Sequence, residues 1–202
     1  MSTPTLYYFD GRARGEVSRL LLAYSGKKYT DLRNPFPLQD EVRAKTPFGQ
    51  LPYYVDDKID LAQSVAIEYY LADQLQLAGS STIETAQILQ YSLLPGDLYA
   101  PYFQAYLGND EAALKTFSSE TAPKVFKKLE ALLVKAGGEH LVNNKLSWAD
   151  ISIFNLLDFF HQQPGNLVDV LQPFHVLLAF HKKIGSIPQL AEYIKVRPTT
   201  IF

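Results

Sequence analysis

The sequence predicts an α/β domain at residues 1–76 followed by an all-α domain at residues 82–202. In the first part, short apolar and aromatic runs alternate with helical patterns, which is typical of strands joined by helical crossovers. Residues 77–81 (Leu-Ala-Gly-Ser-Ser) form a short, small-residue linker. After it, helical periodicity dominates, and no alternating strand pattern appears between Thr82 and Lys195.

A parallel pair of strands is predicted at the start of the first domain. Thr5–Phe9 is a compact aromatic strand, which Asp10-Gly11 ends. The basic connection Arg12–Gly15 leads to a helix at Glu16–Ser25, because apolar residues recur there at helical spacing. A weaker strand follows at Lys28–Arg33, so the helix is predicted to cross over between parallel strands.

An antiparallel hairpin is predicted to complete the first domain. A short helical turn at Gln39–Ala44 precedes strands at Leu51–Val55 and Lys58–Leu61, which an Asp56-Asp57 turn joins. Ser64 is predicted to be the N-cap of the next helix. The resulting order is βαβ, a short helix and then ββα, which is the order expected of a thioredoxin-like domain.

Three features stand out in the helical domain. Pro95-Gly96 and Pro123 fall within two long helical stretches and are predicted to kink or split them. Ser147–Asp150 matches a capping box, a structural motif to which we assign no chemistry. Tyr99, Tyr102, Phe103 and Tyr106 form one helical stripe, which packs in a core most often. The alternative to core packing is that the stripe lines a partly solvated groove, because each phenol hydroxyl needs a hydrogen-bond partner.

Composition and motif content exclude several classes of function. The net charge of −2 provides no basic excess for nucleic acid, and no apolar run approaches membrane-spanning length. No secretory signal opens the sequence, so we expect a soluble, cytoplasmic protein. Zero cysteines exclude disulfides and a cysteine nucleophile, and the four histidines lack metal-ligand spacing, so we expect no metal site. Hydrolase and phosphate-loop motifs are also absent.

Two details of the hairpin segment allow a binding function. If the Leu51-Pro52 bond is cis, the N–H and C=O of Leu51 are free to pair with an extended peptide, although a trans bond is commoner. Gln63-Ser64 is either an anion site at a helix N-terminus or a plain N-cap without a ligand. Local sequence alone favours the plain alternative in both cases.

One strand end carries candidate chemistry. A phenol, Tyr7 or Tyr8, lies near Arg12 and Arg14, and a tyrosine hydroxyl beside positive charge can stabilise an anion. If the anion is a thiolate, such a donor raises the ionised fraction of a thiol, which is only a few per cent near pH 7. Because the chain has no cysteine, the thiol would belong to a bound ligand.

Four motifs in order then resemble the cytosolic glutathione transferases. They are Tyr8–Glu16, Pro47–Pro52, Gln63–Ile67 and Ser147–Asp150, and the similarity extends to the Arg197-Pro198 tail. The sigma class, which includes the haematopoietic prostaglandin D synthases and the S-crystallins, is the most similar. The resemblance covers the chain from end to end.

The resemblance implies roles for individual residues. Tyr8 is then the catalytic phenol, and Leu51 precedes a cis proline and pairs with the cysteinyl backbone of glutathione. Gln63 and Ser64 bind the γ-glutamyl carboxylate, and Arg14 lies near the thiol. The implied glutathione-binding residues are Tyr8, Arg14, Gln39, Arg43, Gln50, Leu51, Pro52, Gln63, Ser64 and Asp97.

Two implied positions depart from the family pattern, and one implies a partner. Gln39 and Arg43 stand where the family usually has Trp and Lys on the glycyl carboxylate, which puts the affinity for glutathione in question. Asp97 would reach the ligand's ammonium group across a subunit interface, so we expect a homodimer. Phe48 either plugs into the partner subunit or makes a local core contact.

The predicted function is conjugation of the glutathione thiolate to hydrophobic electrophiles, with glutathione as co-substrate. Candidates for the hydrophobic substrate pocket are Phe9, Tyr99, Phe103, Tyr106 and Phe202. One alternative is a glutathione-dependent isomerase of the prostaglandin D synthase type, for which glutathione is a true cofactor. The other is a non-enzymatic protein on the same fold, either S-crystallin-like or a ligand carrier.

Overall fold

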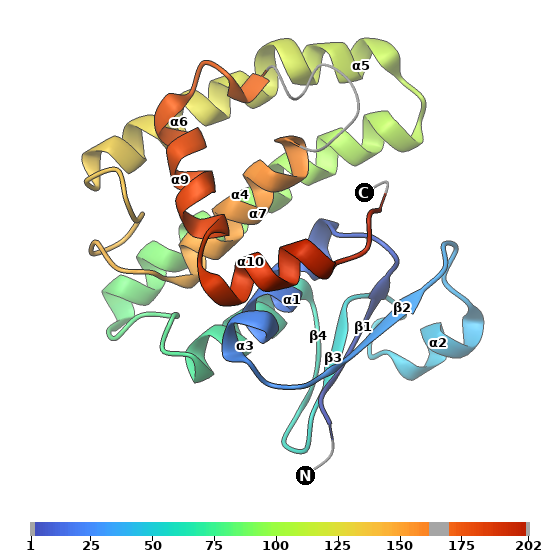
Figure 1. Ribbon diagram of the computed structural model, residues 1–202. Helices are drawn as coiled ribbons and strands as arrows, with labels where there is room; N and C mark the ends of the chain where they lie inside the picture. The colour runs from blue at the N-terminus through green and yellow to red at the C-terminus, as the bar shows by residue number, and fades with distance from the viewer. Residues whose placement is uncertain (1–2, 162–169, 201–202) are drawn as a thin grey trace. The chain divides into compact units, whose positions relative to one another are not determined.

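The computed structural model describes residues 3–161 and 170–200. Contacts divide the chain into two compact units (Figure 1). The first unit comprises Met1–Leu77 and Pro188–Phe202, and the second comprises Ala78–Ile187. The predicted linker therefore lies next to the boundary, whereas the C-terminal segment groups with the α/β unit and not with the helical one.

The first unit contains the predicted mixed sheet. Its strands are β1 (Thr5–Phe9), β2 (Thr30–Asn34), β3 (Tyr53–Val55) and β4 (Asp60–Ala62), in the spatial order β2-β1-β3-β4. β1 pairs with β2 in parallel, while β1–β3 and β3–β4 are antiparallel. The crossover and the hairpin that periodicity and turn residues predicted are both present, and the thioredoxin-like fold of this unit is confirmed.

Four helices belong to the first unit: α1 (Ala13–Ser25), α2 (Asp40–Lys45), α3 (Ser64–Gln74) and α10 (Pro188–Val196). α1 packs against α3 and, on another side, against α10 (Figure 1). The sequence analysis placed the residues of α10 in the helical domain. Helical periodicity shows that a helix has an apolar face but not which element covers that face.

α1 begins earlier than predicted. The expected connection Arg12–Gly15 is mostly helical, since the carbonyl of Arg12 accepts hydrogen bonds from the N–H groups of Gly15 and Glu16, both at 3.0 Å. Ala13 carries an unusual φ of 29° at this start. The early start places the first turn of the helix directly beside the end of β1, which matters for the site.

α3 also starts differently from the prediction. Gln63, and not Ser64, is the N-cap residue, with φ 74° and ψ 119° and no side-chain capping bond. A positive φ is uncommon for a residue with a side chain and stores backbone strain. The prediction of Ser64 as N-cap was therefore wrong by one residue.

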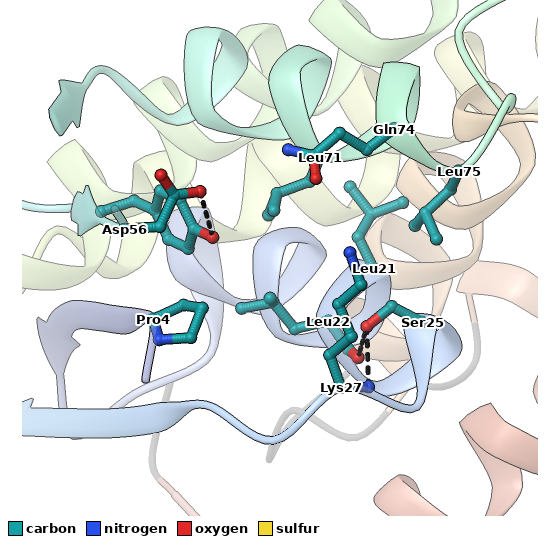
Figure 2. A pocket seen from close by; sticks show the side chains of 10 residues that line it. Pro4, Leu21, Leu22, Ser25, Lys27, Asp56, Leu71, Gln74 and Leu75 are labelled. Atoms are coloured by element: carbon teal, nitrogen blue, oxygen red, sulfur yellow. Dashed lines mark hydrogen bonds between the residues drawn. The ribbon is translucent and has the colours of Figure 1, made fainter. Parts of the chain in front are cut away.

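The C-terminal ends of α1 and α3 leave a cavity of about 70 Å³, drawn in Figure 2. Leu21, Leu22 and Leu71 supply apolar lining, and Ser25 and Asp56 stand at its margin. The Ser25 hydroxyl already donates to the carbonyl of Leu22 at 2.6 Å, and the Asp56 carboxylate accepts from the Tyr54 hydroxyl at 3.1 Å. The candidate residues for chemistry lie at the opposite, N-terminal ends of these helices.

The second unit is helical. Its helices include α4 (Thr82–Leu107), α5 (Glu111–Thr116), α6 (Ala122–Lys135), α7 (Trp148–His161) and α9 (His175–Gly185). Within residues 78–161 and 170–187 no strand occurs, as predicted. None of the helices in the described part of the chain is long and apolar enough to span a membrane.

The two predicted proline effects have different outcomes. α4 runs without interruption through Pro95 and Pro101, so Pro95-Gly96 does not split it. Pro123 stands in the first turn of α6, directly after a π-helical turn, and it has no N–H to donate to that preceding turn. A π-helical turn at Phe117–Thr121 joins α5 to α6, and this is where the second long stretch changes its winding.

The capping box predicted before α7 is present in modified form. The carboxylate of Asp150 accepts from the N–H of Ser147 at 2.7 Å and from the N–H of Leu141 at 2.9 Å. The Ser147 hydroxyl donates to the same carboxylate at 3.0 Å instead of capping a backbone N–H. Asp150 therefore anchors both the helix start and the preceding loop, and its role is structural.

Candidate active site

Tyr8 lies at the junction of β1 and α1. Its side chain is buried, with 6% exposed, and its hydroxyl oxygen accepts a hydrogen bond from the N–H of Arg14 at 3.2 Å. Burial raises the pKa of the Tyr8 phenol, while that N–H and the charges of Arg14 and Arg19 act to lower it. Because the N–H already occupies an acceptor position, the hydroxyl proton remains able to point at a bound anion.

Gly15 allows this arrangement. A Cβ atom at Gly15 would lie 2.3 Å from Cδ1 and 2.4 Å from Cγ of Tyr8, which is far inside van der Waals contact. The ring of Tyr8 thus rests directly on the backbone of the first helical turn. The sequence pattern indicated no role for Gly15 beyond a turn in a connection, because close packing between a strand and a helix leaves no local signal.

A cavity of about 30 Å³ lies close to this junction. It brings together six of the predicted glutathione-binding residues, which come from the start of α1, the segment before β3 and the start of α3. Its lining residues are Arg14, Phe48, Gln50, Leu51, Pro52, Ala62, Gln63 and Ser64. Arg14 links it to Tyr8, because the backbone N–H of Arg14 binds the phenol.

Leu51 presents a free backbone edge to this cavity. The Leu51-Pro52 bond is cis, as the family resemblance implied. β3 begins only at Tyr53, and within residues 3–161 and 170–200 neither the N–H nor the C=O of Leu51 has a hydrogen-bond partner. An unpaired donor and acceptor on one residue can accept one residue of an extended peptide.

The start of α3 supplies a second polar feature of the same cavity. Gln63 is exposed and Ser64 is half-buried, and both line the cavity. The first N–H groups of a helix have no intrahelical acceptor, and together with the helix dipole they favour an anion. Gln63, with its unusual backbone conformation, thus lies in the cavity between the unpaired edge of Leu51 and the N-terminus of α3.

Gln39 and Arg43 lie apart from the cavity lining. Gln39 is the exposed N-cap residue of α2, and Arg43 is exposed on the same short helix. The Arg43 guanidinium donates to the carbonyl of Gly49 at 3.2 Å, which ties α2 to the loop before β3. Their predicted contact with a glycyl carboxylate stays a prediction.

The predicted hydrophobic-pocket residues differ in exposure. Phe9 is half-buried in the first unit, with its ring edge-on to that of Tyr8 at 5.5 Å between centroids. In the second unit Tyr99 is buried at 2% exposure, and its hydroxyl accepts from the Asn155 amide at 3.1 Å. Phe103 and Tyr106 are half-buried. Phe202 lies outside the described residues.

The Tyr99 side chain thus has the partner that a core phenol needs. Its ring packs against those of Phe103 and Phe159, with centroids 6.1 Å and 5.0 Å away. If Phe103 lines a substrate pocket, the buried Tyr99 would lie behind it and hold its ring in place. Asp97, two residues earlier, is exposed on α4. Its predicted contact with a ligand of a partner subunit stays a prediction.

Sequence reasoning missed a buried ionic cluster next to Tyr8. Arg19 and Glu16 have no exposed side-chain surface and lie 3.2 Å apart. The guanidinium carbon of Arg19 lies 5.5 Å from the centroid of the Tyr8 ring. The i, i+3 spacing of opposite charges was the available signal, but on a helix it usually marks a solvated pair.

The first unit thus combines a thioredoxin-like fold with an unpaired backbone edge, a helix N-terminus and a buried phenol, and a helical unit follows it. Two family models match: "Glutathione S-transferase, N-terminal domain" over residues 4–73 and "Glutathione S-transferase, C-terminal domain" over residues 96–197. The chain belongs to the glutathione S-transferase family, whose enzymes use glutathione as co-substrate, and it is a glutathione transferase.

Individual relatives agree with the family. The chain is 34% identical to a probable glutathione S-transferase 5 of Caenorhabditis elegans over 98% of each chain. The structure of a monomeric glutathione S-transferase of the hookworm Necator americanus matches with TM-score 0.87 and 28% identity over all of both chains. A prostaglandin synthase D of Nilaparvata lugens matches with TM-score 0.87 and 27% identity, over 98% of this chain and all of that one.

Proposed function

We propose that this chain joins the thiolate of glutathione to hydrophobic electrophiles and that Tyr8 stabilises the thiolate. One observation carries the role of Tyr8: its hydroxyl oxygen accepts the N–H of Arg14, so its proton is available for the sulfur. Arg14 also lines the adjoining cavity, where its positive charge favours an anion. A buried donor of this kind acts strongly, because little water competes with it.

The chemical step follows from these groups. Glutathione loses its thiol proton to solvent, and the Tyr8 hydroxyl donates to the resulting sulfur anion. The thiolate sulfur then attacks the electrophilic carbon, a C–S bond forms, and a leaving group departs with its bonding electron pair. Tyr8 raises the reactive fraction of a thiol that is only a few per cent ionised near pH 7 in water.

The peptide part of glutathione is assigned to the cavity and its neighbours. The free N–H and C=O of Leu51 pair with the cysteinyl residue, with Gln50 and Pro52 on either side. Gln63 and Ser64 at the start of α3 bind the γ-glutamyl carboxylate. Gln39 and Arg43 on α2 bind the glycyl carboxylate. This arrangement rests on the unpaired edge of Leu51 and on the helix N-terminus beside it.

Glutathione affinity tests the assignment of Ser64. Ser64→Ala removes a hydroxyl donor to a carboxylate, and bonds to charged groups contribute about 1.5–3 kcal/mol. We expect the Kd for glutathione to rise about ten- to a hundredfold by isothermal titration calorimetry. Ser186→Ala, which removes a similar hydroxyl from the second unit, should leave Kd unchanged. An unchanged Kd in Ser64→Ala would remove Ser64 from the site.

A second function deserves a direct assay, because one structural neighbour is a prostaglandin synthase D. An enzyme of that type would return glutathione unchanged while it isomerises its substrate, whereas a transferase consumes glutathione. The ratio of glutathione consumed to product formed separates the two.

We place the chain with the sigma class, as a cytoplasmic detoxification enzyme, on the motifs that include Gln63–Ile67. An S-crystallin-like or carrier function would show glutathione binding without turnover.

We further propose that the chain forms a homodimer. Phe48 is 64% exposed at the cavity margin, and Asp97 is exposed on α4, which would suit contacts with a partner subunit. One structural neighbour is described as monomeric, so family membership alone does not decide the question. Sedimentation at micromolar concentration should give twice the chain mass of 22.8 kDa, and Phe48→Ser should shift the mass towards the monomer. A wild-type mass near 22.8 kDa would contradict the proposal.

A further inference from the structure

Arg19 is placed to act on the ring of Tyr8. The guanidinium carbon lies 5.5 Å from the ring centroid, and the side chain of Arg19 has no exposed surface. A cation within about 6 Å of an aromatic face is attracted by the ring's electrons, and the attraction grows when both groups are desolvated. An ionised phenol carries extra negative charge on its ring, so the same cation favours the phenolate over the phenol.

Four acceptors fix the guanidinium in this position. Its Nε donates to Asp31 Oδ1 at 3.0 Å, and Nη1 donates to Glu16 Oε2 at 3.2 Å. Nη1 also donates to the carbonyl of Gly11, and Nη2 donates to the carbonyl of Phe9 at 3.2 Å. A planar guanidinium held on both edges cannot swing away from Tyr8, which distinguishes Arg19 from a mobile surface cation.

The far end of the chain completes this cluster. Glu16 is buried, and its Oε1 accepts from the Tyr193 hydroxyl at 3.1 Å and from Arg197 Nη1 at 3.0 Å. Tyr193 lies in α10, and Arg197 follows its last residue. These partners stand 177 and 181 residues from Glu16 in the sequence. The Arg197 guanidinium therefore offsets part of the charge of the carboxylate that faces Arg19, and the Tyr193 hydroxyl of α10 adds a hydrogen bond to it.

We propose that Arg19 stabilises the ionised form of Tyr8 across the face of its ring, and that α10 sustains this effect by pairing Glu16 with Tyr193 and Arg197. Arg19 is a positioning residue, since it acts on substrate only through Tyr8. The proposal rests on the proposed function in one respect, namely that Tyr8 is the donor to the glutathione thiolate.

The charges around Tyr8 determine in which direction each substitution shifts its ionisation. Arg14 and Arg19 favour the phenolate, while Glu16 disfavours it. On β2, Asp31 pairs with Arg19 and also with Arg33, whose Nε lies 2.8 Å from it. From α10 the Tyr193 hydroxyl faces Glu16, and so does the guanidinium of Arg197, the residue that follows α10. Removing Arg19 and removing the charge of Glu16 must therefore change the ionisation of Tyr8 in opposite directions.

The ionisation of Tyr8 itself is the measurement. Tyrosine labelled with ¹³C at Cζ reports the ionised fraction by NMR, and Tyr8→Phe assigns the signal. We expect Arg19→Met to lower the ionisation constant of Tyr8 about tenfold, as loss of a desolvated cation–π contact implies. Glu16→Gln should raise that constant. Spectra are compared at the highest pH at which circular dichroism shows every variant folded.

A purely structural role for Arg19 predicts a different pattern. Burial raises the pKa of Tyr8, so a loosened, hydrated site would raise its ionisation constant in both variants. A rise in Arg19→Met, or no change in it, would overturn the proposal.

A second pair of variants keeps the test decisive if Arg19→Met does not fold. Arg197→Met leaves Arg19 in place but deprives Glu16 of a cation, and we expect a two- to threefold lower ionisation constant for Tyr8, on the order of a partly screened charge. Lys195→Met removes an equal charge from an exposed site on α10 and should change nothing. Equal effects of the two substitutions would exclude a role for α10.

Activity measured in parallel separates this proposal from the proposed function. If both hold, the acid limb of kcat/KM against pH moves to higher pH in Arg197→Met, because a less acidic phenol is a weaker donor to the thiolate. If Tyr8 ionisation shifts while the pH profile stays fixed, the cluster acts on Tyr8 as proposed but Tyr8 is not the thiolate donor.

Discussion

Tyr8→Phe should lower kcat/KM for an aryl halide about a hundredfold, with little change in the Kd for glutathione. The substitution removes the one hydroxyl that accepts the Arg14 N–H and can donate to the sulfur, while the ring keeps its place against Gly15. Loss of a single preorganised donor to a developing anion costs about 10²–10³ in rate. Steady-state kinetics with glutathione in excess measure the loss.

Tyr7→Phe is the matched control. Tyr7 is the preceding residue of β1, its side chain points to the other face of the strand, and its ring lies 5.6 Å from that of Tyr53. We expect near wild-type activity from this variant. If instead Tyr7→Phe were inactive and Tyr8→Phe active, the other phenol of the Tyr-Tyr pair would be the donor.

Gly15→Ala should both destabilise the first unit and reduce activity. The added Cβ would meet Cγ of Tyr8 at 2.4 Å, and Cγ lies too close to the backbone to move without moving the whole ring. Overpacking of this kind costs about 1–3 kcal/mol. Because relief requires displacement of the phenol, we expect kcat/KM to fall at least tenfold in the molecules that remain folded.

Urea unfolding and kinetics on the folded fraction check both effects of Gly15→Ala. Gly96→Ala is the control, since a Cβ at Gly96 in α4 would meet no atom within 4 Å apart from its own stretch of helical backbone. There alanine should be neutral or stabilise the protein by up to about 1 kcal/mol, as helix propensity suggests. Equal stability of Gly15→Ala and wild type would mean that the ring of Tyr8 is not held against the helix.

Much of the fold could be predicted, because each element carried a local signal. The alternation of strands with one helical crossover and the Asp56-Asp57 turn predicted the sheet topology, and helical periodicity predicted the second unit. The errors lie where local preference yields to packing. α4 passes through Pro95 without the split that was one of the two predicted outcomes, and α3 takes the strained Gln63 as its N-cap in place of Ser64.

The candidate site was predictable to the extent that it lies in short motifs. Leu51-Pro52 and Gln63-Ser64 were recognisable in the sequence, and the structure places them on one cavity with Arg14. Arg19 was not recognisable, because its importance comes from contact with Tyr8 and from Glu16, whose distant partners are Tyr193 on α10 and Arg197 just after it. A contact between residues 177 positions apart cannot be predicted from residue spacing in a single sequence.

The pKa of the glutathione thiol on the enzyme tests the central claim most directly. Titration of the enzyme–glutathione complex, followed by the ultraviolet absorbance of the thiolate, should show a thiol pKa well below the free value of about 8.5, and Tyr8→Phe should return it towards that value. A bound thiol that titrates near its free value in the wild type, or identically in Tyr8→Phe with glutathione still bound, would contradict the role of Tyr8.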